Sequence, residues 1–280
     1  MRHTVVIPTL DRPAALARCR RSLDAQTTPV TEVLLVTERG ELSQLRNAGA
    51  RRATRPELLS FLADDVECAP GWAAAVQARF ARAPELVGVA GPAVLPPDAR
   101  RRRDLFRTPA LKRLYDACFL VGRASLPGML SVAGTWTTGA CDPTCTYSGP
   151  VDYLEACNQT WRADAFWAVG GFDETFGGIG DWSEPDLAQR VRYLTGGTRW
   201  FDPAAAVVHH ADQTGAYLAR EQVGARLSNY HRFAARWVRP HWRHTAFLAF
   251  LHVYYGGKAL RWHVNRLLGP SDCARRATGS

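Results

Sequence analysis

The most informative stretch of this sequence is Leu59-Ser60-Phe61-Leu62-Ala63-Asp64-Asp65-Val66-Glu67, which Pro70-Gly71 closes. Its first part has the length and apolar character of a buried strand, and it ends abruptly in two adjacent carboxylates. Strand ends are where α/β sheets bind ligands, and neighbouring carboxylates suit a divalent cation held against phosphate oxygens. A solvated turn is the simpler interpretation of an isolated Asp-Asp pair. The surrounding elements must therefore decide between a turn and a site.

Strands and helices alternate on both sides of this stretch. We expect strands at 3–7, 32–36, 58–62 and 87–90, and helices at 13–25, 42–53 and 71–82, the first capped by Asp11. This alternation predicts an α/β fold with a mostly parallel central sheet flanked by helices. Pro8-Thr9-Leu10-Asp11 follows the first strand, so the chain has neither a G-x-G-x-x-G loop nor a P-loop. A nucleotide would be held in another way.

The pattern weakens between about 96 and 149, which contains four consecutive arginines, and then resumes. A strand-like run is predicted at 151–161, a short helix at 162–169, a longer helix at 184–193, and an apolar run at 204–208 that ends at His209-His210. Amphipathic helices are predicted after Thr214 and over 245–268. We therefore expect an α/β domain over 1–212, with a variable segment at about 96–149, and a helical C-terminal region over 213–280.

The composition indicates which partners and which cellular location suit the protein, but it does not choose a function. The net charge of +9 suits anionic partners such as nucleotides, lipid phosphates, an acidic membrane face or nucleic acid. Seven scattered cysteines without a C-x-x-C pair favour reduced thiols and a cytoplasmic location, although a zinc site or disulfide at Cys141 and Cys145 stays open. We see no signal peptide, and no apolar run is long enough to cross a bilayer.

Several motifs, taken in order, carry a family resemblance. They are Val5-Val6-Ile7-Pro8-Thr9, Arg46-Asn47-Ala48-Gly49, Phe61-Leu62-Ala63-Asp64-Asp65, Asn158 to Arg162 followed by Gly170-Gly171-Phe172-Asp173-Glu174, Ser183-Glu184-Pro185-Asp186-Leu187, and Val208-His209. Together they resemble the family 2 glycosyltransferases, which have the GT-A fold and use nucleotide-sugar donors. The resemblance covers roughly residues 3 to 212, and the Gly-Gly-Phe-Asp-Glu motif is its most specific part.

The resemblance implies a role for each motif. A divalent ion, Mn²⁺ or Mg²⁺, would act as a Lewis acid on the leaving diphosphate, with Asp65 and His209 as its ligands and His210 as the alternate. Glu184 is the implied general base for the acceptor hydroxyl, and Asp186 is the alternative if the register differs by two residues. The remaining implied donor contacts are Pro8, Thr9, Arg46 and Asp64, and Trp182 could stack on a sugar face or pack in the core.

Three positions depart from the family pattern. Thr37 stands where many relatives have an aspartate that reads the uracil edge, so the donor base stays open unless Glu38 replaces that contact. Ala63 and Ser183 replace the first acids of their motifs. A weakened metal site, or an inactive relative, is therefore an alternative.

These observations lead to one main expectation. The chain is predicted to be an inverting, metal-assisted hexosyl or deoxyhexosyl transferase that moves a sugar from a nucleotide-diphosphate sugar to a glycan, lipid-linked or small-molecule hydroxyl. The alternative is a non-catalytic basic relative that binds lipid or polyanions, and no specific nucleic-acid partner is expected. The aromatic, arginine-rich C-terminal helices could pack on the catalytic domain, form a homodimer interface, or contact the inner face of a membrane peripherally.

Overall fold

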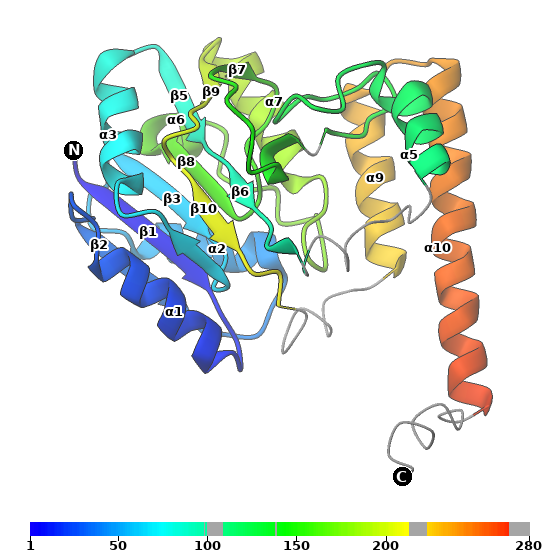
Figure 1. Cartoon of the computed structure of the whole chain (residues 1–280), viewed down its shortest axis with the longest axis horizontal. Helices are drawn as coiled ribbons and strands as arrows, with labels where there is room; N and C mark the ends of the chain where they lie inside the picture. Colours follow the sequence, from blue (N-terminus) through cyan, green and yellow to red (C-terminus); the bar gives the residue numbers. More distant parts are fainter. Residues whose placement is uncertain (98, 100–108, 138, 213–222, 269–280) are drawn as a thin grey trace.

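A seven-stranded sheet forms the centre of the molecule in this computed structural model, which describes residues 1–97, 99, 109–137, 139–212 and 223–268 (Figure 1). Its strands are β1 (His3–Pro8), β2 (Glu32–Val36), β3 (Leu58–Leu62), β5 (Leu86–Ala90), β7 (Gly149–Val151), β8 (Asn158–Arg162) and β9 (Thr198–Phe201). Their order across the sheet is β2-β1-β3-β8-β5-β9-β7. The expected α/β fold, with a large central sheet and flanking helices, is confirmed.

The direction of the strands differs from the expectation of a mostly parallel sheet. β1 runs parallel to β2 and β3, and β5 runs parallel to β9. β8, however, runs antiparallel to both β3 and β5, and β7 runs antiparallel to β9. β8 follows β7 along the chain and enters between β3 and β5 in the opposite direction, so the sheet is mixed. Residues 152–157, which were expected to continue a strand, form a turn instead.

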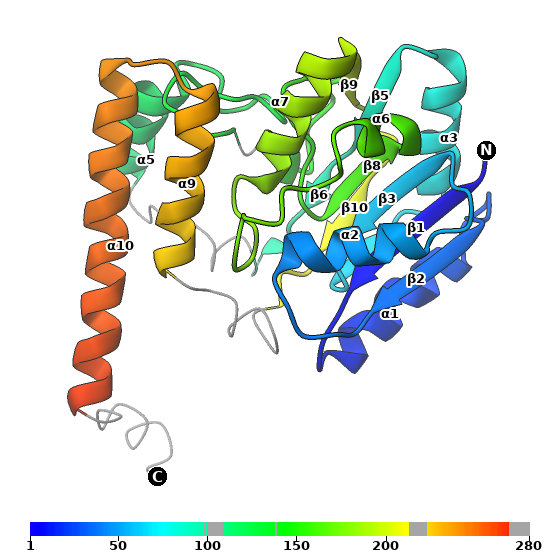
Figure 2. The same cartoon turned by 180° about the vertical axis from the view of Figure 1, so that it is seen from behind.

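Helices cover both faces of this sheet (Figures 1 and 2). On one face lie α1 (Pro13–Asp24) and α3 (Trp72–Arg82), and on the other lie α2 (Leu42–Arg52), α6 (Ala163–Ala168) and α7 (Ser183–Thr195). Successive residues of a strand point to opposite faces. Val5 and Ile7 of β1 therefore pack in the core with α1 and α3, whereas Val6 packs in the core with α2, α6 and α7.

A second, three-stranded sheet lies beside the ends of β1 and β3. It consists of β4 (Val66–Cys68), β6 (Ala93–Val94) and β10 (Val207–His209), with β10 in the middle. β10 pairs antiparallel with β4, so that His209 is opposite Val66, and parallel with β6. This register places His209 next to the carboxylates that follow β3.

The C-terminal helices form a third packed unit. α9 (Val223–Trp237) and α10 (Trp242–Leu268) stand side by side, with α5 (Pro109–Tyr115) against α10 and two short helical turns, Asp116–Leu120 and Gly139–Cys141, nearby (Figures 1 and 2). Their buried side chains join those of the main domain in one apolar cluster, which includes Phe119, Phe176, Trp182, Tyr230, Phe233, Phe247 and Leu251. None of the helices in the described part of the chain combines the length and hydropathy needed to cross a bilayer.

Candidate active site

A cavity of about 380 Å³ lies at the carboxyl ends of β1 and β3. These two strands are neighbours and run parallel, so the residues that follow them meet at one edge of the sheet. Seven of the sequence-predicted site residues line this cavity: Pro8, Thr9, Arg46, Asp64, Asp65, Glu184 and His209. Residues from both halves of the sequence therefore meet in one space.

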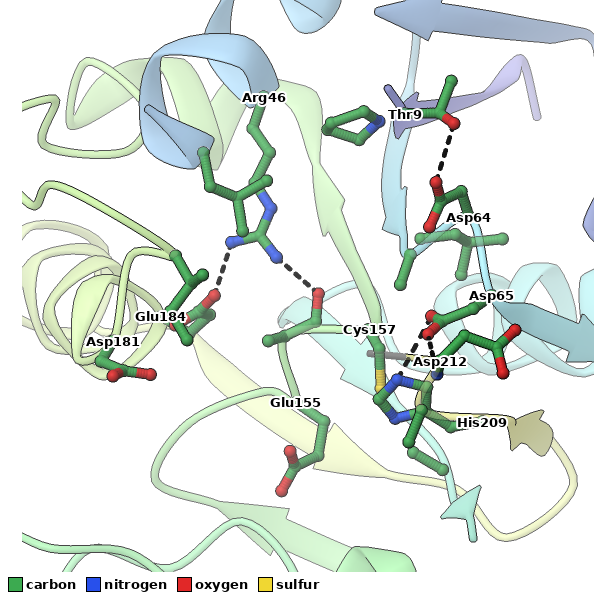
Figure 3. Close-up of a pocket in the computed structure, with 18 of the residues that line it drawn as sticks. Thr9, Arg46, Asp64, Asp65, Glu155, Cys157, Asp181, Glu184, His209 and Asp212 are labelled. Atoms are coloured by element: carbon green, nitrogen blue, oxygen red, sulfur yellow. Dashed lines mark hydrogen bonds and ion pairs between the residues drawn. The ribbon is translucent and has the colours of Figure 1, made fainter. Parts of the chain in front are cut away.

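Asp64 and Asp65 form one side of the cavity (Figure 3). Both are almost completely buried, and Thr9 Oγ1 donates a 2.7 Å hydrogen bond to Asp64 Oδ2. His209 Nε2 lies 3.3 Å from Asp65 Oδ1, and the backbone N–H of Asp212 donates to Asp65 Oδ2 at 2.9 Å. The predicted pair of metal ligands, Asp65 and His209, is thus in direct contact.

Arg12 is a further member of this group that the sequence motifs did not reveal. Its Nη1 is hydrogen-bonded to Asp64 Oδ1, and its Nη2 donates to Asp65 Oδ2 at 2.9 Å and to the carbonyl oxygen of Asp212 at 2.7 Å. The expectation that Asp11 caps α1 is wrong. Asp11 has a positive φ of 55°, and Arg12 takes the capping position without a side-chain cap bond. The Arg12 guanidinium is engaged by the carboxylates instead.

The pKa values of the two carboxylates are shifted in opposite directions. Burial raises the pKa of Asp64 more than the charge of Arg12 and the hydrogen bond from Thr9 lower it. Burial would also raise the pKa of Asp65, but the hydrogen bond and charge of His209, together with Arg12, outweigh it and hold that pKa below its usual range. Asp65 is therefore the carboxylate whose charge the surroundings stabilise more strongly.

The chemistry of this pair suits a divalent ion that is shared with phosphate oxygens. Mg²⁺ and similar ions are commonly held by one or two protein side chains together with substrate phosphates and water, and Mn²⁺ also accepts imidazole nitrogen. Within the described ranges, no cluster of three or more His, Cys, Asp or Glu side chains forms a ready metal cage. Asp65 and His209 therefore fit an ion that arrives with a phosphate ligand.

Glu184 lies on the other side of the cavity, in the first turn of α7 (Figure 3). Its Oε1 accepts a 2.5 Å hydrogen bond from Arg46 Nη1, and the side chains of both residues are more than nine-tenths buried. Arg46 Nη2 also donates to the carbonyl oxygen of Ala156 at 2.7 Å, and its guanidinium lies over the ring of Phe172. Arg46, which was expected to contact the nucleotide, thus lines the cavity and forms an ion pair with Glu184.

Four candidate residues named from the sequence lie outside the cavity: Asp186, Glu38, Trp182 and His210, whose Nε2 lies 3.3 Å from Glu67 Oε2. Asp186 is fully buried behind Glu184, because residues two apart on a helix point in nearly opposite directions. Glu38 has an exposed side chain that lies 3.7 Å from Arg52. Trp182 is buried in the apolar cluster of the C-terminal helices, where its ring meets that of Trp136 at 5.0 Å. Asp186 and Glu38 therefore make no contact with the cavity.

Other lining residues were not anticipated. Most come from segments without a recognisable motif: Trp136, Glu155, Cys157, Asp181, Asp212 and Arg226. Trp136 and Tyr153, not Trp182, supply the aromatic surface of the cavity. Arg226 of α9 lies 3.2 Å from Asp181, so the C-terminal helical region contributes to the wall. Among the residues that the sequence did not reveal, Arg12 alone had a signal for its role, because it lies close in sequence to the end of the first strand.

Comparisons with known proteins identify the fold. No family model matches the sequence, and no curated protein matches it. Solved structures do match: GalNAc-T7 with UDP, GalNAc and Mn²⁺ (TM-score 0.55, 15% identity, 84% of this chain and 48% of that one) and S. aureus TarS 1-349 with UDP-GlcNAc (0.55, 11%, 90% and 72%). A third is the mannosyltransferase PcManGT from Pyrobaculum calidifontis with GDP-Man and Mn²⁺ (0.53, 17%, 100% and 76%).

The fold is GT-A. The chain spans less than half the length of the GalNAc-T7 chain and of a longer TarS chain, 48% and 43% respectively. Within this GT-A fold, the carboxylates that follow β3 and the Glu184 carboxylate of α7 face the same cavity.

Proposed function

We propose that this chain is an inverting glycosyltransferase that moves a sugar from a nucleotide-diphosphate sugar to an acceptor hydroxyl. One observation carries the proposal: a single cavity has Asp65 and His209, in contact with each other, on one side and the Glu184 carboxylate on the other. The GT-A fold supports it, and the order of the motifs supports membership of family 2.

The donor would occupy the side of the cavity formed by the ends of β1 and β3. Thr9 and Asp64 offer a hydroxyl and a carboxylate to the nucleoside, and Asp65 and His209 would hold the divalent ion. When bound, this ion supplies positive charge that stabilises the leaving diphosphate. Trp136, which lines the same cavity, is a candidate surface for a sugar ring.

Glu184 would act as the general base. The acceptor hydroxyl gives its proton to the Glu184 carboxylate while its oxygen forms a bond to the anomeric carbon and the bond to the diphosphate oxygen breaks. Attack from the side opposite the leaving group inverts the configuration at that carbon. Arg46 is a positioning residue in this scheme, since its salt bridge fixes the direction of the Glu184 carboxylate.

The nucleotide preference is tested by thermal-shift measurements with UDP-, GDP- and dTDP-sugars, each with and without Mn²⁺. The three structural neighbours contain UDP, UDP-GlcNAc or GDP-Man, and Thr37 offers no carboxylate for a uracil edge. We expect one donor to raise the melting temperature only when Mn²⁺ is present, and Asp65→Asn to remove that rise. If no donor stabilises the protein and polyanions bind in a salt-sensitive way instead, the chain is the non-catalytic basic relative.

The same donor then tests the base. Nucleoside diphosphate release, with water as the acceptor, should fall by about 10²- to 10⁴-fold in Glu184→Gln, while the Mn²⁺-dependent thermal shift is retained. Arg46→Lys should keep donor binding and give a smaller loss of rate. Unchanged release in Glu184→Gln would remove Glu184 from the mechanism.

A further inference from the structure

Every carboxylate oxygen of Asp64 and Asp65 already contacts a group of the protein. For Asp64, Oδ1 accepts from Arg12 and Oδ2 accepts from Thr9. For Asp65, Oδ1 lies beside His209, and Oδ2 accepts from both Arg12 and the Asp212 backbone. A divalent ion that binds Asp65 would therefore share its carboxylate with these groups, one of which carries a full positive charge.

Arg12 is the partner whose charge competes directly with a cation. Its guanidinium bridges the two carboxylates, and its side chain is only 10% exposed. Arg12 Nε is also buried, with no hydrogen-bond partner among the described residues. A buried guanidinium is stable here because two carboxylates face it. The same carboxylates would bind the ion, so the two cations compete for one anionic pair.

We propose that Arg12 is the resident counter-ion of the Asp64–Asp65 pair, and that it makes the site bind a free divalent ion weakly but bind the ion tightly together with a nucleoside diphosphate. The diphosphate offers Arg12 a second anion, because the guanidinium fork matches phosphate as well as carboxylate. Arg12 can then leave the carboxylates to the ion. This inference rests on the proposed function, because it assigns the donor diphosphate to this cavity.

A move of Arg12 from the carboxylates to the diphosphate would also affect the backbone at Asp212. Arg12 Nη2 binds the carbonyl oxygen of Asp212, while Asp65 binds its N–H. The Asp212 side chain is held separately by Arg18 at 2.8 Å. A change in the partner of Arg12 therefore changes one of the two backbone contacts that hold residue 212 against the site.

The test measures Mn²⁺ binding by electron paramagnetic resonance of the free ion, first without nucleotide. Arg12→Gln should bind Mn²⁺ at least about tenfold more tightly than the wild type, because a unit charge a few ångströms away is removed. Arg12→Lys keeps the charge but cannot bridge both carboxylates, so its affinity should lie between the two. Arg21→Gln, a loss of positive charge at an exposed position near the other end of the same helix, should stay within about twofold of the wild type.

The second measurement adds saturating UDP or GDP. In the wild type the nucleotide should increase Mn²⁺ affinity strongly, and Mn²⁺ should increase nucleotide affinity by the same factor. In Arg12→Gln that factor should shrink by about tenfold. If Arg12→Gln folds poorly without metal, Mn²⁺ should raise its melting temperature more than it raises that of the wild type, and Arg12→Lys supplies the binding data.

Equal or weaker Mn²⁺ binding in Arg12→Gln, or no detectable binding in any variant, would overturn the role of Arg12. Asp65→Asn separates this outcome from a failure of the proposed function. If Asp65→Asn removes Mn²⁺-dependent donor binding while Arg12→Gln behaves like the wild type, only the counter-ion inference fails. The double variant Asp65→Asn, Arg12→Gln tests the metal site itself. If it binds Mn²⁺ as tightly as Arg12→Gln alone, the ion binds elsewhere and the proposed metal site fails.

Discussion

The residues of this site are held by ion pairs that are mostly removed from water. Arg46 and Glu184 are both more than nine-tenths buried, and so are Asp64 and Asp65 beneath Arg12. Deleting one member of such a pair leaves the other charge unpaired and costs about 3–5 kcal/mol. If an alanine variant lost activity, the loss could come from unfolding of the protein as well as from removal of the reacting group. Substitutions of the same shape, such as Glu184→Gln and Asp65→Asn, create no cavity but still leave Arg46 or Arg12 without its charged partner. The stability of each variant must therefore be measured beside its activity.

Single-residue reasoning from the sequence succeeded where function follows a strand end. Thr9, Asp64 and Asp65 come directly after the strands that were predicted, and the structure brings them together. Arg12 could not be assigned in the same way, because one of its contacts is Asp212, 200 residues further along the chain. Whether an arginine is solvated or bound depends on which distant residues the fold brings into contact with it.

His3 gives a prediction for the dependence of stability on pH. Its ring is completely buried, Nε2 lies 2.6 Å from Ser60 Oγ, and burial lowers its pKa from 6.5 to about 4. Above about pH 6.5 the ring is neutral in both states. Between pH 6.5 and 4 only the unfolded chain takes up the proton, so the free energy of unfolding should fall by about 1.4 kcal/mol per pH unit.

Urea unfolding between pH 4.5 and 7.5 measures this effect. His3→Gln should show a smaller loss of stability on acidification than the wild type, and His252→Gln, which changes an exposed ring on α10, should match the wild type. Equal slopes for His3→Gln and the wild type would show that the buried ring does not set the acid limit.

At the level of elements, the position of α2 determines where Arg46 can reach. Gly49 lies at the contact of α2 with the sheet, where an added Cβ would be 2.4 Å from Val6 Cγ1 and 2.8 Å from Val36 Cγ2. The absence of a side chain lets the helix lie directly on β1 and β2. Arg46 is one turn earlier on the same helix, so this close packing also sets its distance from Glu184.

Gly49→Ala should therefore destabilise the protein, although alanine favours helices. We expect a loss of about 1–3 kcal/mol from the forced shift of α2, measured by chemical denaturation. Gly256→Ala is the matched control, because a Cβ there meets nothing within 4 Å, and it should be neutral or stabilise by up to about 1 kcal/mol. A Gly49→Ala variant as stable as the wild type would mean that α2 has room to move.

The elements that escaped prediction share a physical cause. β9, with the sequence Thr-Arg-Trp-Phe, is polar at two of its four positions, and Arg199 is buried in it with bonds to the carbonyl oxygens of Gly197 and Val151. β8 carries buried polar side chains, and its antiparallel direction is set by pairing with β3 and β5, which are distant in the sequence. Hydrophobic periodicity reveals elements that bury one apolar face. Neither β9 nor the direction of β8 produces such a pattern.

At the scale of the whole molecule, Asp186 joins the C-terminal helices to the catalytic side. Its carboxylate accepts hydrogen bonds from Arg190 of α7 at 2.7 Å, and from Arg236 and Trp237 of α9 at 3.0 and 2.9 Å. We propose that the helical C-terminal region is docked on the α/β domain through this buried carboxylate and the apolar cluster around Tyr230. α9 in turn presents Arg226 to the cavity.

Asp186→Asn should therefore lower stability by about 3 kcal/mol and increase amide hydrogen exchange in α9. Asp173→Asn, which removes a more exposed partner of the same Arg236, should cost about 1 kcal/mol or less. A large loss of turnover in Asp186→Asn with unchanged stability and exchange would instead assign the base to Asp186.

The pairing of β10 with β4 limits how the contact between Asp65 and His209 can change in evolution. The partner of Asp65 is selected by backbone register: His209 pairs with Val66, whereas His210 turns outward and lies 3.3 Å from Glu67. A slip of one residue would exchange the two imidazoles without altering a single side chain. The length of the connection between β9 and β10 is thus under the same constraint as the ligands themselves, and insertions should be tolerated elsewhere on the surface before they are tolerated there.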